Sequence, residues 1–90
     1  MIDQSILARH PRNVQDVVRF LDSSHLADAR LRFTVQKFET LAAELLLDMN
    51  TSADLVLTLR ALVVAKNLAM QAKILDIEDN GDNVQTQSGL

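Results

Sequence analysis

The sequence has no cysteine, tryptophan or tyrosine, only one proline, and only two glycines among its 90 residues. Without cysteine the chain can form no disulfide framework, thiolate metal site or thiol nucleophile. With so few glycines it has no glycine-rich loop of the kind that holds phosphates. Hydrophobic residues make up 48% of the chain, which indicates one folded domain rather than a disordered protein.

Charge and hydropathy argue against two classes of partner, nucleic acid and membrane. The net charge of −3 argues against nucleic acid, because a phosphate backbone is held by a basic surface. The N-terminus lacks the basic leader of a signal peptide. The longest apolar stretch is interrupted by Arg60, Lys66 and Lys73, well short of the ~20 residues that a bilayer requires. We therefore expect a cytoplasmic protein that binds neither DNA nor membrane.

Hydrophobic spacing predicts an all-α fold with three parts. Residues 1–12 are expected to form an N-terminal arm, residues 13–78 a helical hairpin domain, and residues 79–90 a disordered C-terminal tail. Pro11 disfavours helix at His10, and Asn13 followed by Asp16 predicts the start of a short helix that ends near Asp22. The apolar face of this short helix consists of Val14, Val17, Val18 and Leu21.

A long antiparallel αα-hairpin is expected to follow the short helix. Its first helix is predicted from about residue 31 or earlier to about residue 49, with apolar positions that alternate by four and three. These positions are Leu31, Val35, Phe38, Ala42, Leu45 and Met49, and Leu41 and Leu46 widen the seam. Thr51 followed by Asp54 predicts the cap of the second helix. A turn this short makes the two helices antiparallel neighbours.

The second helix of the hairpin, residues 51–78, is apolar on almost every side. Because residues advance by about 100° around a helix, Arg60, Asn67, Gln71 and Glu78 form one polar strip. A helix that is apolar all round needs neighbours on several sides, more than one short chain supplies. We therefore predict a homo-oligomer in which one face packs within the hairpin and the other meets sister chains around Arg60 and Lys66.

Basic residues mark two candidate binding regions. Arg9, His10 and Arg12 surround Pro11 in the arm, and this segment is either an anion site or a solvated basic surface. Lys66 is surrounded by apolar residues, and we expect its methylene stem to pack against them while its ammonium remains solvated. Arg30 and Arg32 form a further small cluster. No metal or cofactor is expected.

Enzymatic alternatives rest on few residues. Asp22, Ser23 and His25 could act together only if they converged on a substrate, and closeness in sequence does not create a catalytic triad. Ser24 and His25 are explained more simply by the start of a helix. Asp76, Glu78 and Asp79 are explained as a solvated helix end rather than a metal site. We therefore expect a protein that is not an enzyme.

The hairpin residues resemble a known family. Residues 38–42 read FETLA and residues 59–72 read LRALVVAKNLAMQA. This pattern is similar to the F-x-x-L-A … L-R-x-L-x-x-A-K-[DN]-x-A-x-x-A hairpin of small bacteriophage anti-CBASS and anti-Thoeris sponges, which sequester the cyclic nucleotide signals of bacterial immunity without cleaving them. The His10-Pro11 segment also resembles the N-terminal part of that family.

The resemblance implies a homo-oligomer, commonly a hexamer, that binds cyclic di- or trinucleotides, or cyclic ADP-ribose-type signals, where protomers meet. It points to Arg60, Lys66 and Asn67 on the long helix and to His10 and Pro11 in the arm, and it implies action in an infected bacterial cell. The sequence differs from the family in having Glu39 and Thr40 where a lysine is usual, and no tyrosine or tryptophan for base stacking. The alternative is a hairpin that binds another protein and has no small ligand.

Overall fold

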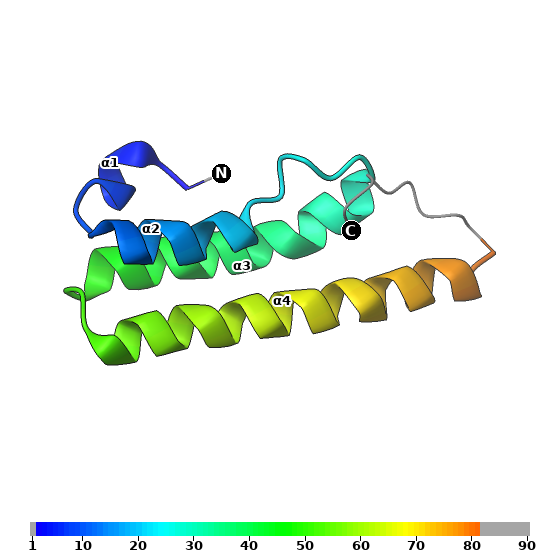
Figure 1. Cartoon of the computed structure of the whole chain (residues 1–90). Helices are drawn as coiled ribbons and strands as arrows, with labels where there is room; N and C mark the ends of the chain where they lie inside the picture. The colour runs from blue at the N-terminus through cyan, green and yellow to red at the C-terminus, as the bar shows by residue number, and fades with distance from the viewer. Residues whose placement is uncertain (1, 82–90) are drawn as a thin grey trace.

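The computed structural model describes residues 2–81, and within this range the chain forms helices and turns and no strand. In Figure 1 the two long helices run antiparallel and are joined by a short turn, while the shorter helices lie along the half of the hairpin nearest this turn. The predicted all-α hairpin is confirmed. The elements are α1 (Gln4–Leu7), α2 (Arg12–Val18), the 3-10 helix η1 (Arg19–Leu21), α3 (Ala29–Asp48) and α4 (Ala53–Asp79).

Side-chain caps and one glycine define the ends of the long helices. The Asp28 carboxylate accepts a 2.8 Å hydrogen bond from the Arg30 N–H at the start of α3. The Ser52 hydroxyl accepts one of 3.1 Å from the Leu55 N–H at the start of α4. The predicted Thr51 cap is therefore wrong by one residue. After α4, Gly81 has φ +82°, a backbone conformation that glycine adopts without steric cost.

The N-terminal segment is more structured than an extended arm. Asp3 caps α1 by accepting a 2.8 Å hydrogen bond from the Ser5 N–H. The next helix, α2, begins at Arg12 with Pro11 at its N-cap, so the predicted Asn13 cap is also wrong. Proline suits this boundary because it lacks the N–H that a helix start leaves unpaired. Most of the predicted tail, residues 82–90, lies outside the described residues.

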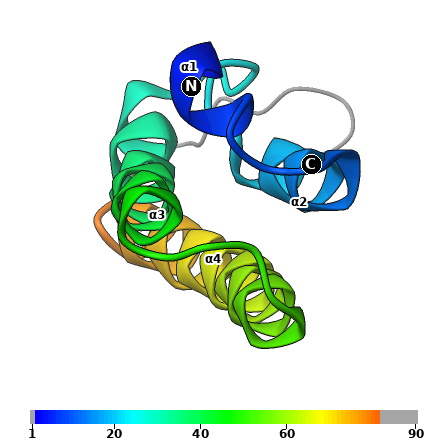
Figure 2. The same cartoon turned by 90° about the vertical axis from the view of Figure 1, so that its left-hand side faces the viewer.

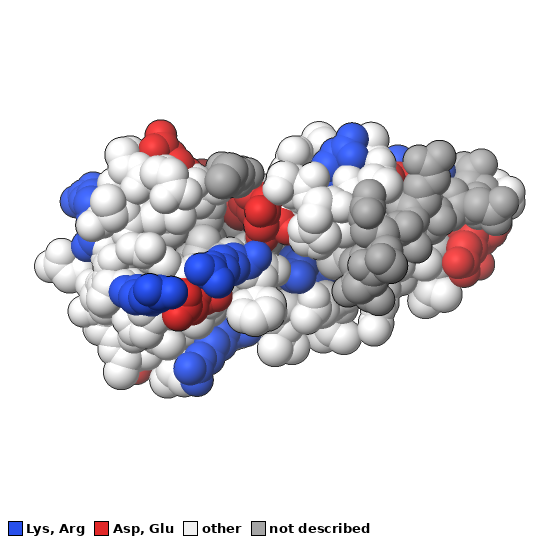
Figure 3. All heavy atoms as spheres, turned by 45° about the horizontal axis from the view of Figure 1, so that its top comes forward, with Lys and Arg blue, Asp and Glu red and all other residues white. Residues whose placement is uncertain are grey.

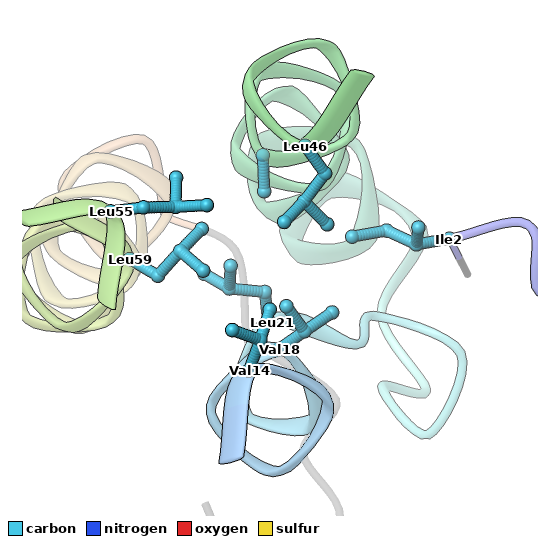
Figure 4. Packing of buried hydrophobic residues seen from close by; sticks show 8 residues of the cluster. Ile2, Val14, Val18, Leu21, Leu46, Leu55 and Leu59 are labelled. Atoms are coloured by element: carbon cyan, nitrogen blue, oxygen red, sulfur yellow. The ribbon is translucent and has the colours of Figure 1, made fainter. Parts of the chain in front are cut away.

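The core lies where α2, η1, α3 and α4 meet near the turn of the hairpin. Figure 4 shows leucines of α3 and α4 pointing at the apolar side of α2 and η1, with Ile2 closing the edge. This cluster consists of Ile2, Val14, Val18, Leu21, Ala42, Leu46, Leu55 and Leu59. A smaller second cluster consists of Leu26, Leu31, Val35 and Met70. Each fully buried leucine contributes about 2 kcal/mol to stability.

The inward stripe of α3 differs from the prediction at its C-terminal half. The buried residues are Leu31, Val35, Glu39, Ala42 and Leu46. Leu45 is only half-buried and Met49 is exposed, because α3 turns its inward side toward α1 and η1 as well as α4. Glu39 is accommodated because its Oε1 accepts a 2.9 Å hydrogen bond from the Ser23 N–H in the connection before α3.

The long helix α4 has an inward and an outward side of similar composition. Its buried residues are Leu55, Leu59, Met70 and Ile77. The large apolar residues of its outward side are Leu57, Val64, Leu68 and Leu75, and each is about 60% exposed (59, 60, 61 and 60%). Figure 2 shows α2 and α3 on the same side of α4, which leaves its other side uncovered by the described elements. Across residues 2–81, no helix combines the length and apolar character needed to cross a membrane.

Candidate ligand-binding groove

A groove runs between α4 and the α2–η1 segment. It has two compartments of about 600 and 300 Å³, and Phe20, Val63 and Asn67 line both. Each volume is in the range of small-molecule sites, roughly 300–1,000 Å³. Asn13, Asp16, Val17 and Arg60 complete the first compartment, and Arg19, Asp22, His25, Leu26, Val35, Lys66 and Met70 complete the second.

The floor of the groove comes from three predicted site residues on α4. Arg60 and Asn67 are seven positions apart, two helical turns, and so project from the same side. Lys66 lies half-buried in the smaller compartment. Burial lowers the pKa of its ammonium below the ordinary value of 10.5, and no acidic neighbour in the described chain offsets this effect. Lys66 therefore faces inward and not, as expected, toward the outward face of α4.

The opposite wall carries an aromatic ring and further charges. Phe20 is 65% exposed on η1, although it lines both compartments. Asp16 lies 4.0 Å from both Arg12 and Arg19, which leaves the three side chains as a loose exposed cluster. Figure 3 shows basic side chains gathered around an acidic one on the α2 side of the molecule.

The connection from η1 to α3 closes one end of the groove with Asp22 and His25. The Asp22 carboxylate accepts a 3.0 Å hydrogen bond from the Ser24 N–H. Burial alone would raise the pKa of Asp22, but the Ser24 hydrogen bonds and the nearby positive charges, His25 included, together lower it. Three basic side chains (Arg19, Arg60 and Lys66) thus face two carboxylates (Asp16 and Asp22), so the lining of the groove is net positive in an acidic protein.

His10 is a structural residue of the arm and does not line the groove. Its side chain is buried, and its Nε2 donates a 2.8 Å hydrogen bond to the Leu46 carbonyl oxygen. Its Nδ1 lies 2.8 Å from the Thr51 hydroxyl. Since the carbonyl can only accept, the proton of a neutral ring is on Nε2 and Nδ1 accepts from Thr51. His10 therefore ties the arm to the turn between α3 and α4.

The other basic residues of the arm and of α3 also lie away from the groove walls. Arg9 and Arg12 are exposed, and neither they nor Pro11 line either compartment. Arg30 pairs with Asp28 at 2.9 Å. Arg32 donates hydrogen bonds to the Leu26 and Ala27 carbonyl oxygens, at 2.6 and 3.0 Å. Arg30 and Arg32 therefore hold the connection before α3 in place.

The residues considered for catalysis do not converge. Ser23 is buried and its N–H is bonded to Glu39, while Asp22 is bonded to Ser24. No hydrogen bond between residues 2 and 81 joins the His25 ring to the Ser23 hydroxyl. Within the same described range, no group of three or more histidine, cysteine, aspartate or glutamate side chains is arranged to hold a metal ion.

A second hollow, of about 440 Å³, lies between the N-terminal segment and α3. Asp3, Glu39 and Glu44 line it, and no lysine or arginine does. A carboxylate lining repels phosphates, so this hollow is unsuited to an anionic ligand. The groove beside α4 is therefore the better candidate for anion binding.

Sequence reasoning identified the floor of the groove but missed its wall. Phe20, Arg19 and His25 come from the short helices and the connection, whose placement depends on the tertiary fold. A signal for Phe20 was present: at about 100° per residue it falls outside the apolar face of the short helix, roughly 110° from its centre. A large aromatic on the polar side of a short helix is a candidate contact for a ligand.

Comparisons of the chain with protein-family models, with curated proteins and with solved structures give no match. The function is therefore inferred from the geometry and chemistry of the groove.

Proposed function

We propose that this protein is a non-enzymatic binding protein that sequesters a cyclic nucleotide signal in the groove between α4 and the α2–η1 segment. The observation that supports this proposal is the convergence of Arg60, Lys66 and Arg19 around the exposed ring of Phe20. Cations and an aromatic ring side by side suit a ligand that carries both phosphates and flat bases.

Each side chain has a distinct task in this proposal. Arg60 and Arg19 form charge-assisted hydrogen bonds with phosphate oxygens, and arginine binds these oxygens in pairs. Phe20 stacks on a base, and such stacking contributes about 1–3 kcal/mol per base. Asn67 lines both compartments and supplies an amide for the base edge or the ribose.

The charge of Lys66 makes the proposed binding of phosphate dependent on pH. Its ammonium is partly desolvated in the free protein, which is why its pKa is lowered. A phosphate beside it would restore the missing stabilisation of the charge and raise the pKa toward its ordinary value. Binding should therefore strengthen as pH falls through the lowered pKa of Lys66, because the charged form is the one that pairs with phosphate.

The resemblance of the hairpin to phage sponges supplies the biological setting. We propose that the protein acts in the cytoplasm of an infected bacterial cell as an anti-defence protein, where it lowers the free concentration of a cyclic di- or trinucleotide or a cyclic ADP-ribose-type signal. The mechanism is sequestration, so the ligand leaves the protein unchanged. Slow release, rather than fast capture, would determine its effectiveness.

Isothermal titration calorimetry of the purified protein against cyclic dinucleotides, cyclic trinucleotides and cyclic ADP-ribose isomers tests the proposal. We expect at least one ligand to bind at micromolar concentration or below, and to be recovered intact when the complex is denatured. No affinity tighter than ~1 mM for any ligand would refute sequestration. Recovery of a cleaved nucleotide would instead indicate turnover.

Matched variants locate the site for whichever ligand binds. Arg60→Ala and Phe20→Ala should each weaken binding by roughly 10- to 100-fold, since each removes one charge-assisted or stacking contact. Arg9→Ala is the control, because Arg9 is exposed and lines neither compartment. If Arg9→Ala weakens binding as much as Arg60→Ala does, the arm and not the groove holds the phosphates.

The exposed outward side of α4 favours a second candidate function, in which the hairpin docks another protein and has no small ligand. Leu57, Leu68 and Leu75 would then be the contact residues. A pull-down with tagged protein from infected cells separates the two functions. Recovery of the protein's own copies alone supports the sponge, while a stoichiometric foreign partner that is lost in Leu68→Glu supports docking.

A further inference from the structure

The outward side of α4 carries a regular apolar repeat. Leu57, Val64, Leu68 and Leu75 are each about 60% exposed. Together with Ala61 and Gln71, these residues recur at alternating intervals of four and three along the helix. This interval is the seam of a two-helix coiled coil, and it extends for about 27 Å along the helix axis. We call these six residues the outward seam.

The outward seam is large enough to need a cover. Four such side chains in one row expose on the order of 400 Å² of apolar surface, which is near the upper end of what a monomer leaves uncovered. A pair of helices meeting along this length would bury about 600 Å² per partner, the lower end of specific interfaces. In Figures 1 and 2 the other described helices all lie on the opposite side of α4.

We propose that the outward seam pairs with the same seam of a second copy of this chain, antiparallel and about a two-fold axis near residue 66. The layers of such a pair are Leu57 against the partner's Leu75, Ala61 against the partner's Gln71, and Val64 against the partner's Leu68. Each layer occurs twice, as an isologous interface requires. This interface does not depend on the proposed ligand, since it follows from the exposed repeat alone.

Self-complementarity favours a second copy as the occupant. In the antiparallel register each small alanine at position 61 meets a long glutamine, so that no layer is left with two small side chains. At the two-fold axis the flanking residues are Ala65 and Asn67, both uncharged, and each would lie near its own copy. No like charges therefore meet at the centre of the interface.

Charge at the helix ends favours the antiparallel direction. The C-terminal turns of α4 carry Asp76, Glu78 and Asp79. A parallel pair would bring the two acidic ends together, whereas an antiparallel pair places each one beside the N-terminal half of the partner's helix. Arg60 then lies on the same flank as the partner's Glu78, about 9 Å from it along the helix axis.

The interface would adjoin the candidate groove. Arg60 and Asn67 flank the outward seam and also line the groove. In the antiparallel pair the partner's Asn67 lies across the two-fold axis from Asn67, on the same side of the dimer. The two grooves would therefore open side by side, with their α4 floors in contact.

Analytical ultracentrifugation of the full chain without ligand tests the interface. We expect a mass of at least two protomers, and a rise of roughly 100-fold or more in the dimer dissociation constant for Leu68→Glu. Leu47→Glu is the matched control, because Leu47 is a leucine of α3 that is 52% exposed and lies outside the seam. Circular dichroism checks that both variants stay helical. A monomeric wild-type chain, or a Leu68→Glu variant that still dimerises like Leu47→Glu, would overturn the proposal whatever the ligand result.

Cross-linking tests the register, and the absence of native cysteine makes single-cysteine variants unambiguous. The antiparallel pair predicts that Leu57→Cys and Leu75→Cys form a disulfide with each other when the two variants are mixed and oxidised. Neither variant alone should cross-link, since two copies of position 57 lie at opposite ends of the dimer. Self-cross-linking of Leu57→Cys with no mixed product would overturn the antiparallel register.

Discussion

The inward and outward sides of α4 are made of the same residue types but lie in opposite environments. Leu59, on the inward side, is 0% exposed, and Leu57, two positions earlier, is 59% exposed. The difference arises because α2, η1 and α3 all pack on one side of the helix. The inward side therefore stabilises the protomer, and the outward side is available to a partner.

This contrast shows how one helix can serve folding and association at once. A helix with a single apolar side can bury that side against the rest of its own chain. In contrast, α4 has one apolar side buried against its own chain and a second that the described elements leave exposed. The candidate groove lies at the boundary between the two sides, where Arg60, Lys66 and Asn67 emerge. Three matched pairs of variants test the contrast.

The largest effect is expected for Leu59→Ala compared with Leu57→Ala. Leu59→Ala should lower the free energy of unfolding by about 2–5 kcal/mol, because it leaves a cavity in the core. Leu57→Ala should change it by less than about 0.5 kcal/mol. Urea unfolding at concentrations where the chain is monomeric measures both. Equal losses for the two variants would contradict the division of α4 into two sides.

An intermediate effect is expected for His10→Ala compared with Arg9→Ala. His10→Ala leaves the buried Leu46 carbonyl oxygen without its partner and frees the arm from the hairpin turn. It should cost about 1–3 kcal/mol of stability. Arg9 is exposed, so Arg9→Ala should be nearly neutral. Thermal unfolding measures both, and a neutral His10→Ala would mean that the arm adds nothing to the inward side of the hairpin.

The smallest effect is expected for Lys66→Met compared with Lys73→Met. The folded-state pKa of Lys66 is lowered by burial, so its charge opposes folding at neutral pH. Lys66→Met should therefore stabilise the protein at pH 7, by less than about 1 kcal/mol. Lys73, whose ammonium lies 3.8 Å from the Asp76 carboxylate, is the control for the same change on the same helix.

The pH dependence of that stabilisation follows from linkage. Below the folded-state pKa of Lys66, this lysine is protonated in both the folded and the unfolded chain. The full cost of burying its charge then lowers the stability of the wild type. As pH rises from this pKa to 10.5, the unfolded chain binds more protons, so the wild type gains stability. The advantage of Lys66→Met should shrink over this interval, and a constant advantage up to pH 10.5 would contradict desolvation as its cause.

The helices were predictable because their signals are local. The first helix of the hairpin is predicted from about residue 31 or earlier to about residue 49 and is Ala29–Asp48, and the long second helix is predicted at 51–78 and is Ala53–Asp79. The capping residues were less predictable, since the hydroxyl of either Thr51 or Ser52 could cap the start of the long helix. Ser52 caps α4, while Thr51 is bonded to His10, a contact across 41 positions that no local pattern reveals.

The candidate site was predictable only in part. Arg60, Lys66 and Asn67 were expected on one helix, and the structure places all three beside one groove. His10 was expected at a ligand and is instead buried as a structural residue. The position of the arm relative to the groove was not predictable, because composition cannot distinguish a basic segment that binds anions from one whose histidine is bonded inside the fold.

Hydrophobic spacing along this chain is enough to specify an antiparallel hairpin, because helix periodicity and short turns act over a few residues. Spacing could not specify which side of α4 would be buried, since both sides carry large apolar residues. That choice depends on where α2 and η1 pack, through contacts between residues far apart in sequence such as Val14 and Leu59. Tertiary packing thus decided both the inward direction of Lys66 and the exposure of the outward seam.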